Sequence, residues 1–126
     1  MIVGFGLDVV EVARIARQLE SRSAERFLAR VFTDRERSFC EQFRDRANRY
    51  AARFAAKEAS SKALGVPPGI AFHDVEVVRD LGAPSLVFSG VAGEAARALQ
   101  VEKAHLTLTH DGGVAVAAVI LEGPPA

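Results

Sequence analysis

The chain has 126 residues, of which 49% are hydrophobic, and its 16 basic side chains balance its 16 acidic ones. This composition predicts one globular domain at residues 1–122 with a flexible tail at 123–126, because the chain is long enough for one core and too short for two. Its longest apolar run, residues 114–121, is far shorter than the ~20 residues of a membrane-spanning helix, which argues against a membrane protein.

Two further features bear on location. Cys40 is the single cysteine, so no internal disulfide can form, and we expect a cytoplasmic protein. We expect the thiol of Cys40 to be inert and to contribute to helix packing. The N-terminus has no basic lead-in or long apolar run, and Asp8 interrupts it early, so we expect no signal peptide.

The balanced net charge conceals an arginine-rich segment. Residues 14–53 contain eleven arginines against six acidic residues. The positive electrostatic field of this segment is expected to attract an anionic partner. Nucleic acid, a phosphorylated coenzyme and an acidic protein all qualify.

The first half of the chain predicts a strand followed by helices. Residues 2–7 favour a short strand, in which Gly4 and Gly6 permit close approach of another backbone. We expect Asp8 to end this strand. Its capping-box spacing with Glu11 makes an N-cap the first interpretation of Asp8, although a carboxylate at such a corner can also bind a metal. The expected helices are one from Val12 through Leu19, one at 23–32, and one that a Thr33–Glu36 capping box opens and that runs through Phe43, with a break at 45–48.

The segment 53–65 is the element around which the chain is organised. Its composition favours a helix, and Gly65 followed by Val66-Pro67-Pro68 predicts where the helix ends. Small side chains on one stripe permit its backbone to lie very close to a sheet. The stripe comprises Ala52, Ala55, Ala56, Ala59 and Ala63.

The other faces of this helix carry charge. Glu58 and Lys62 are four residues apart and share a face, while Arg53 and Lys57 lie on an adjoining strip. A glutamate–lysine pair at this spacing is common on solvent-exposed helices. The alanine stripe favours a functional role instead, since a surface helix normally packs with larger side chains.

In the second half of the chain, apolar and polar residues alternate with the two-residue period of β-strands. Antiparallel hairpins after a helical half predict an α+β fold rather than a doubly wound parallel sheet. The expected elements are a hairpin of 72–79 and 85–88 with a turn at Leu81-Gly82-Ala83-Pro84, a helix at 93–99, and a hairpin of 105–109 and 114–121 with a turn at 110–113.

The carboxylates of Asp8 and Glu58 are the best candidates for a chemical site. His105 and His110 face opposite sides of one strand, so a zinc cluster is not supported, and neither a serine triad nor a phosphate-binding glycine loop is evident. Two carboxylates with Lys62 nearby suit a magnesium site that acts on phosphates, because Mg²⁺ keeps several waters and rarely has a full protein cage.

Two segments together resemble the signature motifs of the 4'-phosphopantetheinyl transferases, in the short single-domain group called holo-acyl-carrier-protein synthases. They are GLDVVEVAR at 6–14 and RFAAKEASSKALG at 53–65, and the resemblance continues through residues 82–84 and 105–111. It implies that family's fold, an antiparallel sheet packed against helices. It also implies Mg²⁺-dependent transfer of the phosphopantetheine arm of coenzyme A to a serine of an apo acyl carrier protein, releasing adenosine 3',5'-bisphosphate, in fatty-acid or polyketide metabolism.

The resemblance also implies roles for individual residues. Asp8 and Glu58 would hold Mg²⁺ against the diphosphate, and Lys62 would neutralise charge on the attacked phosphoryl group or on the leaving group. Glu58, directly or through a water on the metal, would accept the proton of the serine. Contacts with the coenzyme are implied for Arg53, Lys62, Gly65, His105 and Thr107.

Partners follow from the same resemblance. Arg14, Arg17 and Arg22 suit docking of an acidic carrier-protein helix, the alternative being a solvated helix face. Family members are typically cytoplasmic homotrimers with the coenzyme between subunits. Two segments depart from the family pattern: Ser60-Ser61 replaces a more apolar pair, and residues 66–69 replace a more glycine-rich loop.

Two other functions stay open at this point. One is a non-enzymatic module that binds anions or nucleic acid through the arginines. The arginines are interleaved with acidic residues, aromatic residues are few and no recognised motif is present, so we expect no nucleic-acid partner. The other is a magnesium-dependent nucleotide phosphohydrolase built on the same carboxylates, which would need no carrier protein.

Overall fold

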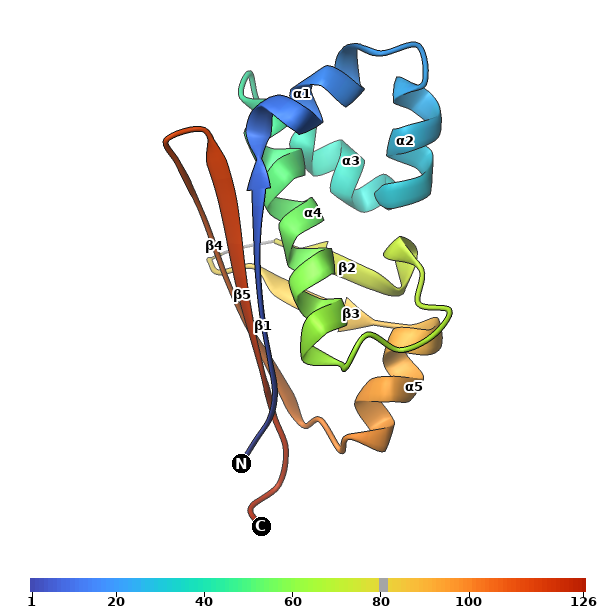
Figure 1. Cartoon of the computed structure of the whole chain (residues 1–126), viewed down its shortest axis with the longest axis vertical. Coiled ribbons are helices and arrows are strands. Elements are labelled where there is room, and N and C mark those ends of the chain that lie inside the picture. The colour runs from blue at the N-terminus through green and yellow to red at the C-terminus, as the bar shows by residue number, and fades with distance from the viewer. Residues whose placement is uncertain (80–81) are drawn as a thin grey trace.

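Helices and antiparallel strands are combined as the sequence predicts, in a computed structural model that describes residues 1–79 and 82–126. Figure 1 shows the long helix α4 (Arg46–Ala63) lying along one face of a three-stranded sheet, with the shorter helices α1 (Val12–Glu20), α2 (Ala24–Val31) and α3 (Asp34–Cys40) gathered at one end. In chain order the elements are β1 (Ile2–Glu11), α1 (Val12–Glu20), α2 (Ala24–Val31), α3 (Asp34–Cys40), α4 (Arg46–Ala63), the 3-10 helix η1 (Phe72–Asp74), β2 (Val75–Val78), β3 (Ser85–Phe88), α5 (Gly90–Ala98), β4 (Lys103–Asp111) and β5 (Val114–Glu122).

The larger sheet has the strand order β1-β5-β4 and is antiparallel throughout. Its central strand β5 pairs with β1 from the opposite end of the chain, with Gly4 opposite Leu121 and Glu11 opposite Val114. Gly112 and Gly113, with φ of 58° and 83°, form the tight β4–β5 turn, which requires left-handed backbone at both positions. Strands β2 and β3 form the separate hairpin expected from the sequence. The turn predicted at 81–84 begins at Leu81, which lies outside the described residues.

The prediction that Asp8 ends the first strand and caps the first helix is wrong. Strand β1 continues to Glu11, which is the N-cap of α1 and makes no side-chain capping bond. The reason is the β1–β5 ladder, which pairs Asp8 with Ala117 and continues as far as Val114. Continuous strand pairing satisfies the backbone groups that the predicted capping box would have satisfied.

Other element boundaries differ by a few residues. The Thr33–Glu36 capping box is confirmed, but α3 ends at Cys40 rather than Phe43. Helix α4 begins at Arg46, inside the predicted break, with Asp45 as its N-cap. The first three residues of the strand expected at 72–79 form η1 instead.

The closest packing joins α4 to the larger sheet. The predicted alanine stripe is confirmed, since Ala52, Ala55, Ala56, Ala59 and Ala63 are all buried. On β1, a Cβ added to Gly6 would overlap the carbonyl oxygen of Ala59, and one added to Gly4 would overlap that of Ala63. The backbones of α4 and β1 are therefore in direct contact, and this contact fixes side chains on both elements relative to each other.

The opposite face of this sheet carries exposed apolar side chains. Phe5, Leu7 and Val9 have exposed fractions of 64%, 51% and 59%. The strand register places each in a row across the sheet with one residue of β5 and one of β4. The rows, called the outer face below, are Phe5-Ile120-His105, Leu7-Ala118-Thr107 and Val9-Val116-Thr109.

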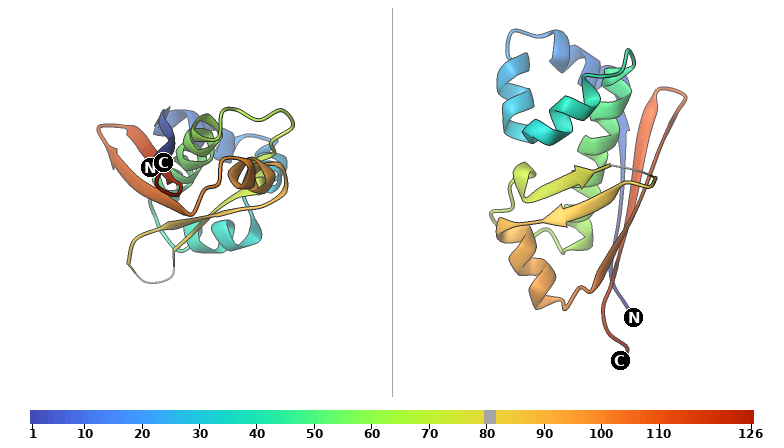
Figure 2. Two further views of the ribbon diagram at one scale, coloured as in Figure 1. Left: turned by 90° about the horizontal axis from the view of Figure 1, so that it is seen from below. Right: turned by 180° about the vertical axis from the view of Figure 1, so that it is seen from behind.

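The two ends of the chain lie side by side (Figure 2). Gly123, the first residue of the expected tail, is buried, and its N–H donates to the carbonyl oxygen of Met1 at 2.8 Å. The flexibility of residues 123–126 stays a prediction. None of the helices in the described part of the chain is long and apolar enough to cross a membrane.

The α4–β1 contact predicts a large cost for a single methyl group. We expect Gly6→Ala to lower the free energy of unfolding by about 3 kcal/mol, because the backbone of α4 cannot give way as a side chain would. Gly93→Ala is the matched control. It lies in α5, where a Cβ meets only ordinary contacts, and it should be neutral or stabilise by up to about 1 kcal/mol. Urea unfolding of both variants measures the difference, and equal stabilities would contradict the packing described.

Candidate active site

A cluster of charged side chains from β1 and α4 forms where the two elements meet. Asp8 lies on the same side of β1 as Gly6, facing α4, and its side chain is only 16% exposed. Lys62 donates to the Asp8 Oδ1 atom at 3.1 Å and to the Leu7 carbonyl oxygen at 3.0 Å. Because the Lys62 side chain is half exposed, this ion pair adds at most about 1 kcal/mol to stability. Its effect is to hold an ammonium group beside the Asp8 carboxylate.

Glu58 belongs to the same cluster. Partial burial raises the pKa of its carboxyl group, the negative charge of Asp8 raises this pKa further, and the positive charges of Lys62 and Arg14 oppose the rise. The charges that act on Glu58 therefore come from three elements: Asp8 from β1, Lys62 from α4 and Arg14 from α1. Lys62 thus lies beside Asp8 and acts on Glu58, while joint binding of a metal by Asp8 and Glu58 stays a prediction.

The raised pKa predicts that ionised Glu58 opposes folding. A folded-state pKa above the unfolded value gives a cost that is present above the folded pKa and absent below the unfolded pKa. In metal-free buffer, Glu58→Gln should therefore raise Tm at pH 7, and the gain should shrink as the pH falls through the normal range of a glutamate. Thermal unfolding from pH 3.5 to pH 7.5 measures this; a lower Tm for the variant at pH 7 would show that the charge is favourably paired.

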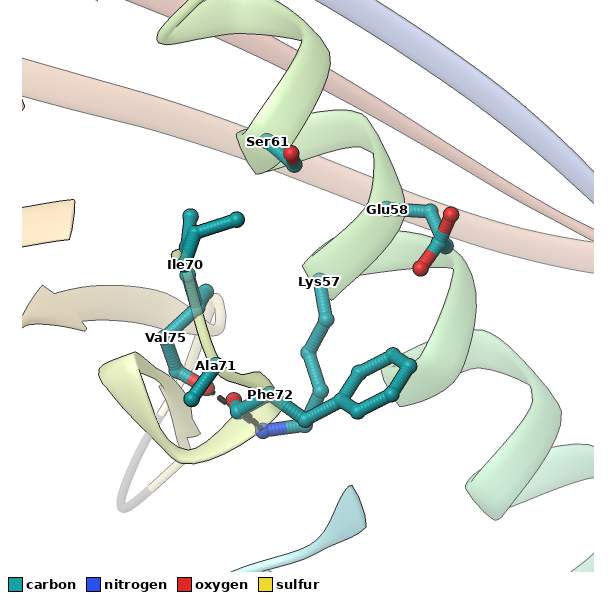
Figure 3. Close-up of a pocket in the computed structure, with 7 residues that line it drawn as sticks. All are labelled: Lys57, Glu58, Ser61, Ile70, Ala71, Phe72 and Val75. Carbon is teal, nitrogen blue, oxygen red and sulfur yellow. Dashed lines mark hydrogen bonds between the residues drawn. The ribbon is translucent and has the colours of Figure 1, made fainter. Parts of the chain in front are cut away.

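A small cavity of about 80 Å³ opens beside Glu58 (Figure 3). We call it the Glu58 pocket; it is lined by Lys57, Glu58, Ser61, Ile70, Ala71, Phe72 and Val75. Figure 3 shows Lys57 extending from α4 toward the η1–β2 segment, while Glu58 projects from another side of the helix. Only Glu58 of these lining residues was singled out as a functional group from the sequence.

Lys57 forms a buried ion pair that the sequence reasoning missed. Its ammonium group lies 2.9 Å from the Oε1 atom of Glu36, and both side chains are almost fully buried. The strip of α4 that carries Arg53 and Lys57 is therefore interior, not solvated. The available signal was a lysine next to an alanine stripe. Its partner Glu36 lies 21 positions earlier in another helix, and the sequence indicated only a capping role for Glu36.

Arg53 is also buried, with 3% of its surface exposed, and its guanidinium stacks on Phe39 at 4.3 Å. Burial lowers its pKa, and its Nε atom has no hydrogen-bond partner among the residues described. It lines a basic hollow of about 240 Å³ between α4 and β4. This β4 pocket comprises Arg49, Ala52, Arg53, Arg79, Leu108, Thr109 and His110.

The remaining expected coenzyme contacts are dispersed. His105 and Thr107 project from the outer face, where His105 Nε2 lies 2.9 Å from Glu122 Oε1. Asp8 faces the opposite side of the same sheet, so one chain does not bring these residues to the Glu58 cluster. Gly65 follows the last turn of α4 with φ of 85°, and the N–H of Val66 bonds back to Ser61, which is the hydrogen bonding of a Schellman motif.

The three arginines expected to bind a partner are exposed on α1 and just after it. Beside them lies a larger hollow of about 410 Å³, which we call the α2 pocket. Arg26 and Arg30 add two more positive charges to its rim. Its lining residues are Gln18, Ser23, Arg26, Phe27, Arg30, Val31, Phe54 and Phe72.

A metal site can be built here only from a small protein donor set. Within the described residues, no group of three or more histidine, cysteine, aspartate or glutamate side chains is placed to hold a metal ion. The pair Asp8 and Glu58 fits Mg²⁺, which commonly takes one or two carboxylates and completes its shell with water and substrate phosphates. It does not fit a closed structural zinc site, which takes four protein ligands.

Comparison with known proteins establishes the family. The profile of the 4'-phosphopantetheinyl transferase superfamily matches residues 4–119. The chain belongs to this superfamily and is an enzyme of the transferase class, which confirms the family that the two sequence motifs indicated.

Relatives and solved structures place it within that superfamily. Holo-[acyl-carrier-protein] synthase of Anaeromyxobacter dehalogenans is 66% identical over 125 residues, 98% of each chain, and that of Myxococcus xanthus is 53% identical over 121 residues, covering 96% of this chain and 95% of the relative. The Helicobacter pylori enzyme in complex with coenzyme A has a TM-score of 0.81 at 30% identity, covering 94% of this chain and 99% of that one. The Bacillus anthracis enzyme in complex with CoA (3',5'-ADP) has a TM-score of 0.79 at 35% identity, covering 98% and 99%. The expected fold class is thereby confirmed.

Proposed function

We propose that this protein transfers the 4'-phosphopantetheine group of coenzyme A to a serine of an apo acyl carrier protein, and that the transfer depends on Mg²⁺. The observation that carries the proposal is the cluster of Asp8, Glu58 and Lys62 beside the Glu58 pocket. Relatives that align with nearly the whole chain are named holo-[acyl-carrier-protein] synthase, and related structures contain coenzyme A. The cytoplasmic location expected from the lone cysteine stays a prediction.

The cluster suits attack on a phosphate diester. The serine oxygen forms a new P–O bond to the phosphorus that carries pantetheine, the diphosphate P–O bond breaks, and adenosine 3',5'-bisphosphate leaves. Glu58 is assigned to accept the proton of the serine hydroxyl, since a positioned carboxylate can act as a general base. Lys62 neutralises charge on the transferred or leaving phosphate. Asp8 and Glu58 are the residues that would hold Mg²⁺, which supplies Lewis-acid stabilisation of the phosphate oxygens when bound.

The transfer experiment tests the proposal and separates it from its rivals. Protein, coenzyme A, Mg²⁺ and an apo carrier protein are incubated, and the mass of the carrier is followed. Addition of a phosphopantetheine group is expected. Hydrolysis of free coenzyme without transfer would indicate a phosphohydrolase, and no reaction of the coenzyme would favour a binding module.

Substitution of either carboxylate should abolish most of this activity. We expect Asp8→Asn and Glu58→Gln each to lower kcat/KM at least about 100-fold, a loss of ~3 kcal/mol of transition-state stabilisation, while circular dichroism stays unchanged. Glu94→Gln is the control, because Glu94 is also a glutamate on a helix, in α5, but is exposed and lines none of the three described pockets. Full activity in either site variant would remove that residue from the proposed metal site.

We propose a trimer with sites between subunits, and the positions of the expected coenzyme contacts support a site that two copies share. Asp8 and Glu58 lie on the inner side of the larger sheet, whereas His105 and Thr107 lie on its outer face. A coenzyme touches both sets only if a second copy supplies the β4 side. The apolar outer face supports self-association, since contiguous exposed apolar surface commonly marks an interaction site.

Light scattering of the wild-type protein should give three times the 13.5 kDa chain mass. We expect Phe5→Asp to shift the protein to monomer and to lower transfer activity, because the charge lies within the outer face. The control is Val87→Asp, a 49% exposed apolar residue of β3 outside this face. A trimeric Phe5→Asp variant would show that another surface mediates assembly.

The carrier protein is assigned to the arginine surface of α1 and α2. Arg14, Arg17 and Arg22 provide the positive field, and the α2 pocket provides an apolar floor between Arg26 and Arg30. Acidic helices are attracted to such a field, and an apolar floor adds burial at the centre of the contact. The positive charge of Arg14 also acts on Glu58, which supports a carrier surface close to the proposed catalytic cluster.

A further inference from the structure

We infer that the buried Glu36–Lys57 ion pair is a positioning device that holds Phe72 as the wall between the Glu58 pocket and the α2 pocket. Phe72 lines both cavities. The inference rests on the proposed function, because it concerns the point where a carrier serine would have to pass from the arginine surface to Glu58. It assigns a role in transfer to residues that contact neither of the two expected metal ligands through a hydrogen bond.

The ion pair is fully hydrogen-bonded. Lys57 Nζ lies 2.9 Å from Glu36 Oε1 and donates to the carbonyl oxygens of Phe72, at 3.0 Å, and of Val75. The remaining oxygen of Glu36 accepts from the backbone N–H of Val77 at 2.8 Å, while Oε1 also accepts from Thr33 at 2.9 Å. All three ammonium protons and both carboxylate oxygens are used, so α3, α4, η1 and β2 are joined at one point.

Stability alone is a weak explanation for such a pair. Replacing a buried ion pair by apolar side chains of similar volume is often neutral or stabilising, because burial of two charges carries a large desolvation cost. The charged groups instead form hydrogen bonds in defined directions, to the carbonyl groups of the η1–β2 segment. Neutral apolar side chains would fill the same space without binding the carbonyl groups of Phe72 and Val75, and the η1–β2 segment would lose its fixed distance from α4.

Phe72 is also held on its outer side. Its ring lies 5.6 Å from that of Phe54, which lies 6.5 Å from that of Phe27 in α2, so three aromatic rings form a row along the α2 pocket. The neighbouring His73 lies 2.7 Å from the Ala29 carbonyl oxygen. The position of Phe72 is therefore set by Lys57 on one side and by α2 on the other.

The test compares variants of the wall with variants of its support. Phe72→Ala removes the wall, Phe72→Leu keeps an apolar wall, and Glu36→Gln/Lys57→Met removes both charges at similar volume. Phe43→Ala is the control, since Phe43 is also half buried but lines neither pocket. For each protein we would measure kcat and KM for the carrier, Tm, and the Kd of coenzyme A with Mg²⁺ by calorimetry.

We expect Phe72→Ala to lower kcat/KM for the carrier roughly 10- to 100-fold, as for other small misplacements of a reacting group. The Kd of coenzyme A should change less than about twofold, Phe72→Leu should restore most of the activity, and Phe43→Ala should transfer normally. Glu36→Gln/Lys57→Met should show the same loss, and adding Phe72→Ala to it should cost little more, because both changes remove one function.

Normal transfer by Phe72→Ala, or losses that multiply when the wall and support variants are combined, would overturn the inference. If the double variant does not fold, the comparison of Phe72→Ala with Phe72→Leu decides alone. Wild-type protein that fails to modify the carrier would overturn the proposed function and this inference with it, whereas active wild type and fully active Phe72→Ala would overturn the inference only.

Discussion

The direct contact between the backbones of α4 and β1 is the constraint on which the rest of the structure depends. It exists because α4 presents alanines where other helices present larger side chains, and because β1 has glycines opposite them. Contact at this range leaves almost no freedom for either element to slide or rotate. Asp8 on the strand and Glu58 and Lys62 on the helix therefore occupy fixed positions relative to one another, and no loop is needed to bring them together.

The same packing explains why positively charged side chains on one helix have different environments. Lys62 remains half exposed and reaches across to Asp8, whereas Lys57, five residues earlier, is interior and reaches Glu36 and two carbonyl groups. Arg53 is interior as well, stacked on Phe39. A helix that buries so little apolar volume leaves space around its remaining faces, and charged side chains fill that space with specific partners.

Much of this arrangement could be predicted from the sequence, because its signals are local. Alanine spacing gave the buried stripe of α4, alternation and Gly112-Gly113 gave the β4–β5 hairpin, and the spacing of Thr33 and Glu36 gave a helix start. Asp8 was misjudged because a capping signal competes with strand pairing to a partner more than a hundred residues away. The Glu36–Lys57 pair and the position of Phe72 between two pockets depend on tertiary contacts, for which one sequence carries no local periodic signal.

The pairing of β1 with β5 has a consequence for the way the chain reaches its native state. The central strand of the sheet is the last strand to be synthesised, and both α4 and β1 pack against it. During translation the alanine face has only part of its sheet until residues 114–122 emerge, and closing such a long loop slows folding. Until then β1 and β4, which both pair with β5 in this sheet, have no strand between them, and an incompletely paired sheet of apolar strands is prone to aggregate.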